Sequence, residues 1–400
     1  MRLTLALTAR GRPRLAHIEG LRAVAVFAVV ATHIALLSGF TAANPLGPLT
    51  ARLNVGVALF FVLSAYLLYR PFVEARLNGS TDPDVRRYAV RRLLRILPAY
   101  LVALVILGAV LPDEAPGVFG SDWWAYFGLL QVYFEDTGVG GLGVTWSLST
   151  EFAFYLVLPV LAWAAARLLA GRPRALQVRL ELVLLAVSVV AAFAVRHVVV
   201  HEGWMRTFPN TLIGKWPWFA VGLALAVIRA AWGALPAGER PPLVRSIRTH
   251  PWAWWAAAGA LLLFAAYGGV LPRQVFLMSA GEAQMELLLY ALFGFCLSAP
   301  ILLHDAAEAR GPATVLALVP VAWLGAISYG IFLWHYPIAR WTLSWTSGNA
   351  WIYAAVTCAL TIACAAISWY AVEKPCMRLA VGRRSSPATV ARAELTEPAP

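Results

Sequence analysis

About ten apolar runs, each close to the length that a helix needs to cross a lipid bilayer, constrain the fold of this chain most strongly. They fall at residues 20–38, 53–69, 94–112, 145–166, 181–200, 211–228, 252–270, 285–303, 315–337 and 351–371. Hydrophobic residues make up 60% of the 400 residues and charged residues only 13%, too few to cover the surface of a soluble domain. Because helices satisfy their own backbone in lipid, we predict an all-α polytopic membrane protein, a bundle of about ten transmembrane helices.

The basic residues indicate how this bundle is oriented. They cluster before the first run, between the second and third, between the fourth and fifth, after the sixth and after the last. The other connections hold scattered bases such as Arg52, Arg206 and Arg273. Cytoplasmic loops carry an excess of Lys and Arg, so we predict both termini on the cytoplasmic side of the cell membrane. A lipid bilayer, rather than nucleic acid, then accounts for the net charge of +12.

We divide the chain into a cytoplasmic segment 1–16, a transmembrane domain 17–380 and a disordered cytoplasmic tail 381–400. The first run is long and carries Arg22 and His33, which favours a retained span over a cleaved signal peptide. The apolar stretch 118–134 is short, so we predict an interfacial or re-entrant helix there rather than a span. The cysteines and histidines show no metal-type spacing, and we predict no metal site.

Arg22 and His33 are the most informative polar residues within the first run. Eleven positions apart, they lie on nearly the same face of a helix, about 16 Å apart along its axis. Ionisable groups in hydrocarbon are costly unless they face a cavity or a partner. The pattern therefore predicts a functional cavity at His33. A structural histidine bonded to a neighbouring helix remains the alternative.

Arg91, Arg92 and Arg95 lie within one helical turn at the predicted inner boundary of the third run. This cluster concentrates positive charge where a phosphorylated cytosolic ligand could dock. Basic residues at such a boundary also act as topology signals and as anchors for lipid headgroups, and this second interpretation stays open.

Ser147 and Glu151 share one helix face at the start of the fourth run. The carboxylate is placed to interact with the helix dipole, or to orient an imidazole or hold a sugar hydroxyl. In the second case His33 and Glu151 form a base and its orienting partner, the minimum set for deprotonating a hydroxyl. His335, near the end of the ninth run, is a second histidine candidate that we interpret as structural or interfacial.

Several motifs in order resemble the acyltransferase 3 family of integral membrane acyltransferases. Residues 17–26, which run on to His33, resemble the opening of the family, with its arginine, ten residues and a histidine. Further matches are the second-helix signature at 54–64, the arginine motif at 92–98, the fourth-helix motif at 146–155, and the last two helices at 324–337 and 373–375. The sequence departs from the pattern at Ala58, where many members carry an acidic residue.

The resemblance implies that His33 is the essential histidine, with Arg22 as its partner on the same helix. It places Arg91, Arg92 and Arg95 on the donor side and makes Glu151 a further functional residue. The remaining candidates for substrate binding lie in the same motifs and are Ser64, Ser147, Tyr155 and His335. The chain resembles the stand-alone form of the family, without a soluble esterase-like domain.

The function implied by the resemblance is membrane O-acyl transfer. An acetyl or other short acyl group would move from cytosolic acyl-CoA, a co-substrate rather than a bound cofactor, to a hydroxyl of a sugar, surface glycan, glycolipid or macrolide-type product. His33 would act as a general base or form an acyl-imidazole, and both routes stay open. One alternative is a glycan or glycolipid transporter or flippase that couples buried Arg, His and Glu to protons. Another is an enzyme with its donor inside and its acceptor outside, which the predicted opposite placement of Arg95 and Glu151 would allow.

Overall fold

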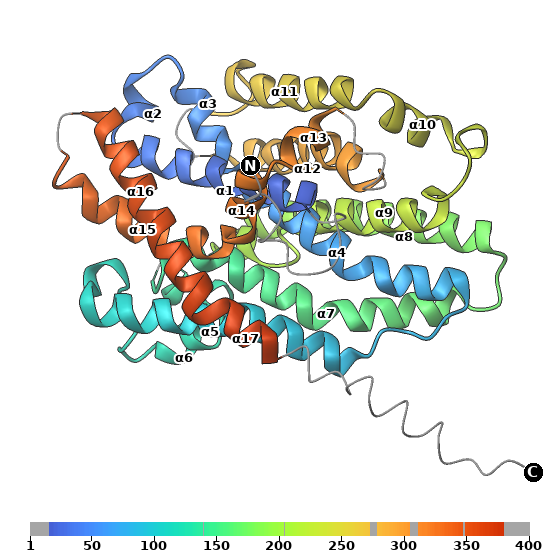
Figure 1. Ribbon diagram of the computed structural model, residues 1–400, viewed down its shortest axis with the longest axis horizontal. Coiled ribbons are helices and arrows are strands. Elements are labelled where there is room, and N and C mark those ends of the chain that lie inside the picture. The colour runs from blue at the N-terminus through green and yellow to red at the C-terminus, as the bar shows by residue number, and fades with distance from the viewer. Residues whose placement is uncertain are drawn as a thin grey trace, which may run out of the picture.

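The computed structural model describes residues 16–138, 140–203, 205–272, 278–304, 311–346 and 349–379. Within these ranges the chain is helical and contains no strand (Figure 1). The predicted N-terminal segment 1–16, apart from Ala16, and the predicted tail 381–400 lie outside the described residues.

Seven helical stretches in the described ranges are long and apolar enough to cross a membrane. They contain α1 (Ala16–Leu37), α4 (Gly56–Asn78), α5 (Val85–Val110), α7 (Trp146–Leu169), α8 (Arg174–His201), α12 (Ala280–Leu302) and α16 (Ala350–Ser368). Two more apolar helices are shorter, namely α9 (Trp216–Trp232) and α11 (Pro251–Tyr267). The predicted all-α membrane fold is therefore confirmed, whereas the number of ten spans and the cytoplasmic termini stay predictions.

The short helices are α2 (Phe40–Ala43), α3 (Gly47–Arg52), α6 (Trp123–Phe127), α10 (Pro242–Thr249), α13 (Pro312–Leu316) and α17 (Lys374–Leu379). The predicted short segment 118–134 contains only α6 and a 3₁₀ turn, too short to cross a bilayer. The prediction that this stretch is not a span therefore holds.

The ninth apolar run, predicted as a single helix over 315–337, is broken. It divides among α13, α14 (Val319–Ala326) and α15 (Ser328–Leu343). Near the break, Gly325 lies against the backbone of α1, where an added Cβ would be 1.7 Å from the Glu19 carbonyl oxygen. This close approach holds the end of α14 on α1, and α15 begins as a separate helix.

Local sequence explains where three of the helices begin. Asp84 accepts a hydrogen bond from the Arg86 amide at 2.8 Å and caps α5. Ser279 forms a capping box with Glu282 at the start of α12, and Asn349 caps α16 by accepting from the Trp351 and Ile352 amides. These side chains satisfy backbone N–H groups that have no partner within the helix.

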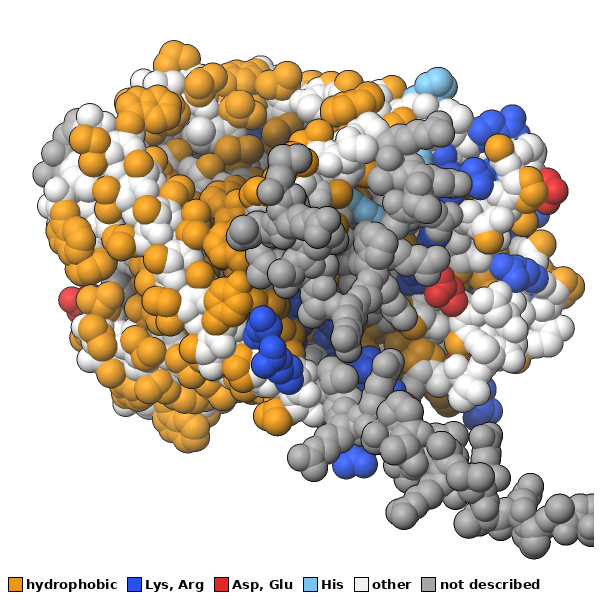
Figure 2. All heavy atoms as spheres, viewed as in Figure 1, with side chains coloured by type: hydrophobic (Ala, Val, Ile, Leu, Met, Phe, Trp, Pro, Cys, Tyr) orange, Lys and Arg blue, Asp and Glu red, His pale blue; other side chains and the backbone are white. Residues whose placement is uncertain are grey.

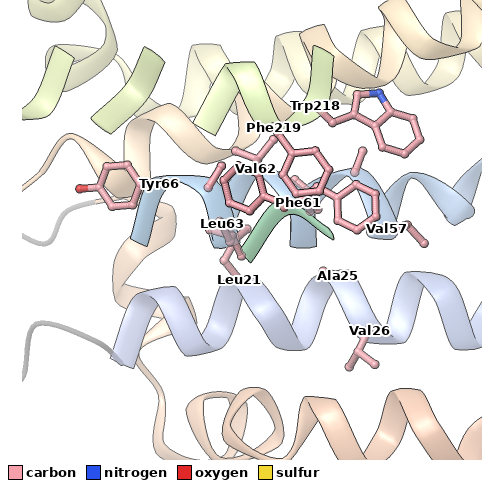
Figure 3. Close-up of a cluster of buried hydrophobic side chains, with 14 of the residues drawn as sticks. Leu21, Ala25, Val26, Val57, Phe61, Val62, Leu63, Tyr66, Trp218 and Phe219 are labelled. Atoms are coloured by element: carbon pink, nitrogen blue, oxygen red, sulfur yellow. The ribbon is translucent and has the colours of Figure 1, made fainter. Parts of the chain in front are cut away.

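The centre of the bundle is the packing of α4 between α1 and α9 (Figure 3). Phe61 of α4 stacks on Phe219 of α9 with 4.5 Å between ring centroids, and Phe219 stacks on Phe154 of α7 at 4.4 Å. Gly222 lets α9 approach α4 closely, because an added Cβ would lie 2.2 Å from the Val62 carbonyl oxygen. Small residues allow such close approach between helices in a membrane. This packing holds α1, α4 and α7 around the cavities described below.

The surface of the bundle suits lipid. Large apolar side chains are exposed on α7, α8, α11 and α16, among them Leu156, Val187, Leu263 and Ile367. Figure 2 shows apolar side chains over much of one face, with most of the basic side chains gathered toward its right side. The apolar belt and the long helices make the chain a multi-pass membrane protein.

Candidate active site

Two cavities lie along α1, with Val57 and Phe332 lining both of them. The arginine cavity has a volume of about 470 Å³ and includes Arg22, whereas the His33 cavity has a volume of about 280 Å³. Arg22 and His33 thus both face cavities, as their spacing predicts. Val57 and Phe332 lie where the two cavities meet.

The arginine cavity brings together every arginine that the sequence singled out. Its charged lining consists of Arg22, Arg91, Arg92 and Arg95 with Glu19 and Glu151. Four guanidinium groups face two carboxylates, which leaves two positive charges in excess. Arginine is the side chain best suited to bind phosphate, so the cavity favours an anionic ligand.

The break before α15 places a hydroxyl against Arg22. The Arg22 Nε donates to Ser328 Oγ at 3.3 Å, and Ser328 is the first residue of α15. Arg22 Nε also lies 3.8 Å from the Glu19 carboxylate one helical turn earlier. The guanidinium is therefore held from two sides at the wall of the arginine cavity.

Glu151 lies in the arginine cavity, with the predicted candidates Ser64, Ser147 and Tyr155 around it. The Ser64 hydroxyl donates to the Glu151 carboxylate, and the Tyr155 hydroxyl donates to the same oxygen at 2.5 Å. The expectation that Arg95 and Glu151 lie at opposite ends of the bundle is wrong, because both line this one cavity. The two cavities are instead separated along α1, with Arg22 in one and His33 in the other.

The predicted pairing of His33 with Glu151 is also wrong. His33 lines the other cavity, and its Nδ1 lies 3.1 Å from the Val29 carbonyl oxygen and 3.1 Å from the Nε2 of His335. The two imidazole centroids are 5.1 Å apart. His335, expected to be structural or interfacial, is the buried partner of His33.

The hydrogen bonds of His335 determine the tautomers of both rings. Its Nδ1 lies 2.7 Å from the Phe332 carbonyl oxygen, which can only accept, so this nitrogen carries the proton. In a neutral ring the His335 Nε2 then has a lone pair and accepts from the Nδ1–H of His33. This assignment leaves the Nε2 of His33 without a proton and able to accept one.

The remaining polar lining of the His33 cavity was missed by the sequence analysis. It consists of Thr32, Thr41, Asn54, Asn210, Lys215 and Glu286, with the Trp146 ring beside them. Lys215 falls within the sixth apolar run, so an ionisable residue in an apolar segment was a usable signal there, as it was for His33. Asn54 begins the second-helix signature at 54–64, whereas Asn210 and the two threonines had no such signal. Together they suit a ligand that carries hydroxyl groups.

Comparisons with known proteins agree with this geometry. A family model described as an acyltransferase domain matches residues 15–370. Peptidoglycan O-acetyltransferase OatA of Listeria monocytogenes is 28% identical over 90% of this chain and 55% of its own length. Acyltransferase MdmB of Streptomyces mycarofaciens is 29% identical over 94% of this chain and 95% of its own length.

The chain thus spans about half the length of the Listeria relative and nearly the whole of the Streptomyces one. No solved structure matches the chain. The matches give no support to the transporter alternative. The family match covers most of the chain and includes every residue of the two cavities, so the chain belongs to the acyltransferase 3 family.

Proposed function

We propose that the protein is a membrane O-acyltransferase that moves a short acyl group from acyl-CoA to a hydroxyl of a sugar or a glycosylated compound. Family membership supports acyl transfer. The observation that carries the proposal is the His33 imidazole in one cavity, paired with the buried His335 behind it, next to a second cavity with four arginines. Arg22 and His33 both belong to α1, so the proposed phosphate-binding site and the proposed base adjoin along this helix.

The arginine cavity is the proposed donor site. The phosphates of coenzyme A carry the negative charge that the excess of guanidinium groups requires. The acyl end would extend past Val57 and Phe332 toward His33, because these two side chains border both cavities. We propose that this site opens to the cytoplasm, where acyl-CoA is made, and that the protein resides in the cytoplasmic membrane.

The His33 cavity is the proposed place of the chemical step. The Nε2 of His33 takes the proton of the acceptor hydroxyl, and the hydroxyl oxygen attacks the thioester carbonyl carbon. The C–O bond forms, the C–S bond breaks, and the sulfur leaves with the proton that His33 held. In the other route the same nitrogen attacks the thioester carbonyl carbon, the C–S bond breaks, and coenzyme A leaves as its thiolate, which gives an acyl-imidazole. The acceptor hydroxyl then attacks the acyl carbon, the C–N bond breaks, and the hydroxyl proton passes to the freed Nε2 and on to the thiolate. His335 acts as a positioning residue in both routes, because it accepts from the Nδ1–H of His33 together with the Val29 carbonyl and so fixes the direction of the ring.

The proposed acceptor is a carbohydrate hydroxyl. The Listeria relative is named for peptidoglycan, a sugar polymer, and the His33 cavity offers amides, hydroxyls and the Trp146 ring. Amide and hydroxyl side chains provide both donors and acceptors for sugar hydroxyls.

Transfer of label from radioactive acetyl-CoA tests the proposal. Membranes with wild type or His33→Ala are incubated with an extract of native glycans and metabolites, after equal expression and insertion have been verified. We expect labelled hydroxyl esters with the wild type and at least a 10²-fold loss with His33→Ala, the usual contribution of a general base. No transfer from acetyl-CoA or longer acyl-CoAs by folded wild type would contradict the function, and retained transfer by His33→Ala would remove His33 from the mechanism.

A further inference from the structure

The His33 cavity contains a buried lysine that the proposed chemistry does not use. Lys215 immediately precedes α9 and is 8% exposed. Its ammonium lies 5.2 Å from the ring centroid of Trp146 and 4.5 Å from that of Trp218. Within the described part of the chain it has no hydrogen-bond or ion-pair partner. A buried ammonium held only by aromatic faces still has three N–H donors to share with a ligand.

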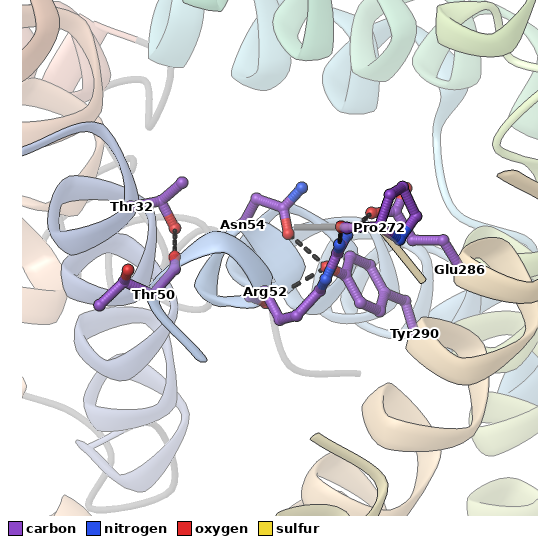
Figure 4. Close-up of polar contacts among 7 residues, drawn as sticks. All are labelled: Thr32, Thr50, Arg52, Asn54, Pro272, Glu286 and Tyr290. Atoms are coloured by element: carbon purple, nitrogen blue, oxygen red, sulfur yellow. Dashed lines mark hydrogen bonds and ion pairs between the residues drawn. The ribbon is translucent and has the colours of Figure 1, made fainter. Parts of the chain in front are cut away.

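The charges behind this cavity do not balance. Glu286 lines the cavity and pairs with the buried Arg52 at 3.2 Å (Figure 4). Arg196 is also buried, bonds to the amide oxygen of Gln284 at 3.0 Å, and interacts electrostatically with both Glu286 and Lys215. Three buried cations therefore surround one carboxylate, which leaves two positive charges in excess. The other carboxylate near Arg52 is Glu282, which is only half-buried and is engaged in the capping box of α12.

Neutral groups around the cavity also favour an anion. Asn54 accepts a hydrogen bond from the Tyr290 hydroxyl on its amide oxygen, which leaves the amide N–H₂ for a ligand (Figure 4). Two helices begin at this cavity, α7 at Trp146 and α9 directly after Lys215. The N-terminus of a helix carries partial positive charge. The Lys215 ammonium, the Asn54 amide N–H₂ and the two helix N-termini thus present full or partial positive charge to the His33 cavity.

We propose that the His33 cavity binds a carboxylate on the acceptor and that Lys215 is its partner, which makes acidic sugars the preferred substrates. This inference rests on the proposed function, since it concerns the acceptor of the same reaction. A volume of about 280 Å³ lies near the lower end of ligand pockets and suits a single sugar ring. The carboxylate would orient the ring, and a hydroxyl of that ring would then face the Nε2 of His33.

Binding of two simple sugars tests the inference without any turnover. Methyl glucuronoside and methyl glucoside differ only in a carboxylate that replaces a hydroxymethyl group. Calorimetry on the protein in lipid nanodiscs should show at least about tenfold tighter binding of the glucuronoside, the usual scale for a charged hydrogen bond. Lys215→Met should remove this preference, whereas Lys215→Arg should keep most of it.

Lys374→Met is the matched control. Lys374 is the only other lysine of the chain, it also lies over an aromatic ring, that of Tyr370 at 5.1 Å, and it lines neither cavity. This variant should bind both sugars as the wild type does. Equal binding of the two sugars by the wild type, no binding of the glucuronoside, or an unchanged preference in Lys215→Met would overturn the inference.

A transfer assay with the same sugars and radioactive acetyl-CoA separates this inference from the proposed function. Transfer to the glucuronoside that Lys215→Met lowers by about tenfold or more, with transfer to the glucoside unchanged, supports both. Transfer to both sugars at the same rate, unaffected by Lys215→Met, overturns the carboxylate site and leaves the acyltransferase intact. A preference in binding without transfer to any sugar or native acceptor supports the carboxylate site and contradicts the acyltransferase.

Discussion

The direction of the His33 imidazole is the residue-scale feature on which the chemistry depends. The Nε2 of His335 accepts a hydrogen bond from the Nδ1–H of His33, so the Nε2 of His33 stays available as a base. We expect His335→Leu to lower kcat by about 10²-fold, because the Nδ1–H of His33 then keeps only the Val29 carbonyl as an acceptor and the ring can rotate. The KM for acetyl-CoA should change little, since the proposed donor site is the other cavity. Steady-state kinetics on purified protein measure both constants.

His335→Gln is the matched variant for this prediction. Its side-chain amide can accept from one neighbour and donate to another, so it should recover part of kcat. A rise in KM without a loss of kcat, or equal losses in the Leu and Gln variants, would argue that His335 supports packing only.

At the same scale, the sequence predicted which residues line the cavities better than it predicted which side chains contact one another. The spacing of Arg91, Arg92 and Arg95 predicted a basic ligand site as one of two interpretations, and all three line one cavity together with Arg22. The partner of His33 could not be found in this way, because His335 is 302 residues away in the sequence. Helix packing decides whether α7, with Glu151, or α15, with His335, approaches α1 at His33, and no local sequence pattern encodes that packing.

At the scale of elements, the close packing of α9 on α4 depends on Gly222. An added Cβ would lie 2.2 Å from the Val62 carbonyl oxygen, a backbone atom that cannot rotate away. We expect Gly222→Ala to lower the free energy of unfolding by about 1–3 kcal/mol through overpacking. Gly259→Ala on α11 is the control, because nothing lies within 4 Å of its added Cβ. Thermal unfolding in nanodiscs compares the two, and equal stability would contradict the tight α4–α9 contact.

The junction of the two cavities makes a second prediction about elements. Val57 of α4 and Phe332 of α15 line both cavities, so their bulk should limit the acyl chain that reaches His33. We expect Phe332→Ala to raise the ratio of octanoyl to acetyl transfer by about tenfold, the scale of specificity from apolar pocket volume. Phe60→Ala is the control, since Phe60 lines the arginine cavity alone. Transfer assays with both acyl-CoAs measure the ratio, and an unchanged ratio in Phe332→Ala would place the acyl path elsewhere.

Apolar periodicity predicted where the helices lie but not how they divide. The ninth run is continuous in sequence, yet α14 and α15 are separate because Gly325 lies directly on the backbone of α1. That break places Ser328 beside Arg22, so a feature that the hydropathy does not show shapes the arginine cavity.

At the scale of the whole molecule, composition alone was sufficient to predict a helical membrane protein. A chain that is 60% hydrophobic and 13% charged can satisfy its backbone in lipid through helices. The count of spans is harder to predict, because α9 and α11 are only 17 residues long and the ninth run is broken. The number of apolar runs in the sequence is therefore larger than the number of long helices in the described part of the structure.

The central claim is that the donor and the base occupy neighbouring cavities along α1. Cryo-electron microscopy of the protein in nanodiscs with a thioether analogue of acetyl-CoA tests this claim most directly, because the analogue cannot transfer its acyl group. We expect its phosphates against Arg22, Arg92 and Arg95, and its acyl end within about 4 Å of the Nε2 of His33. Phosphates bound away from these arginines, or an acyl end on the far side of the bundle from His33, would contradict the account.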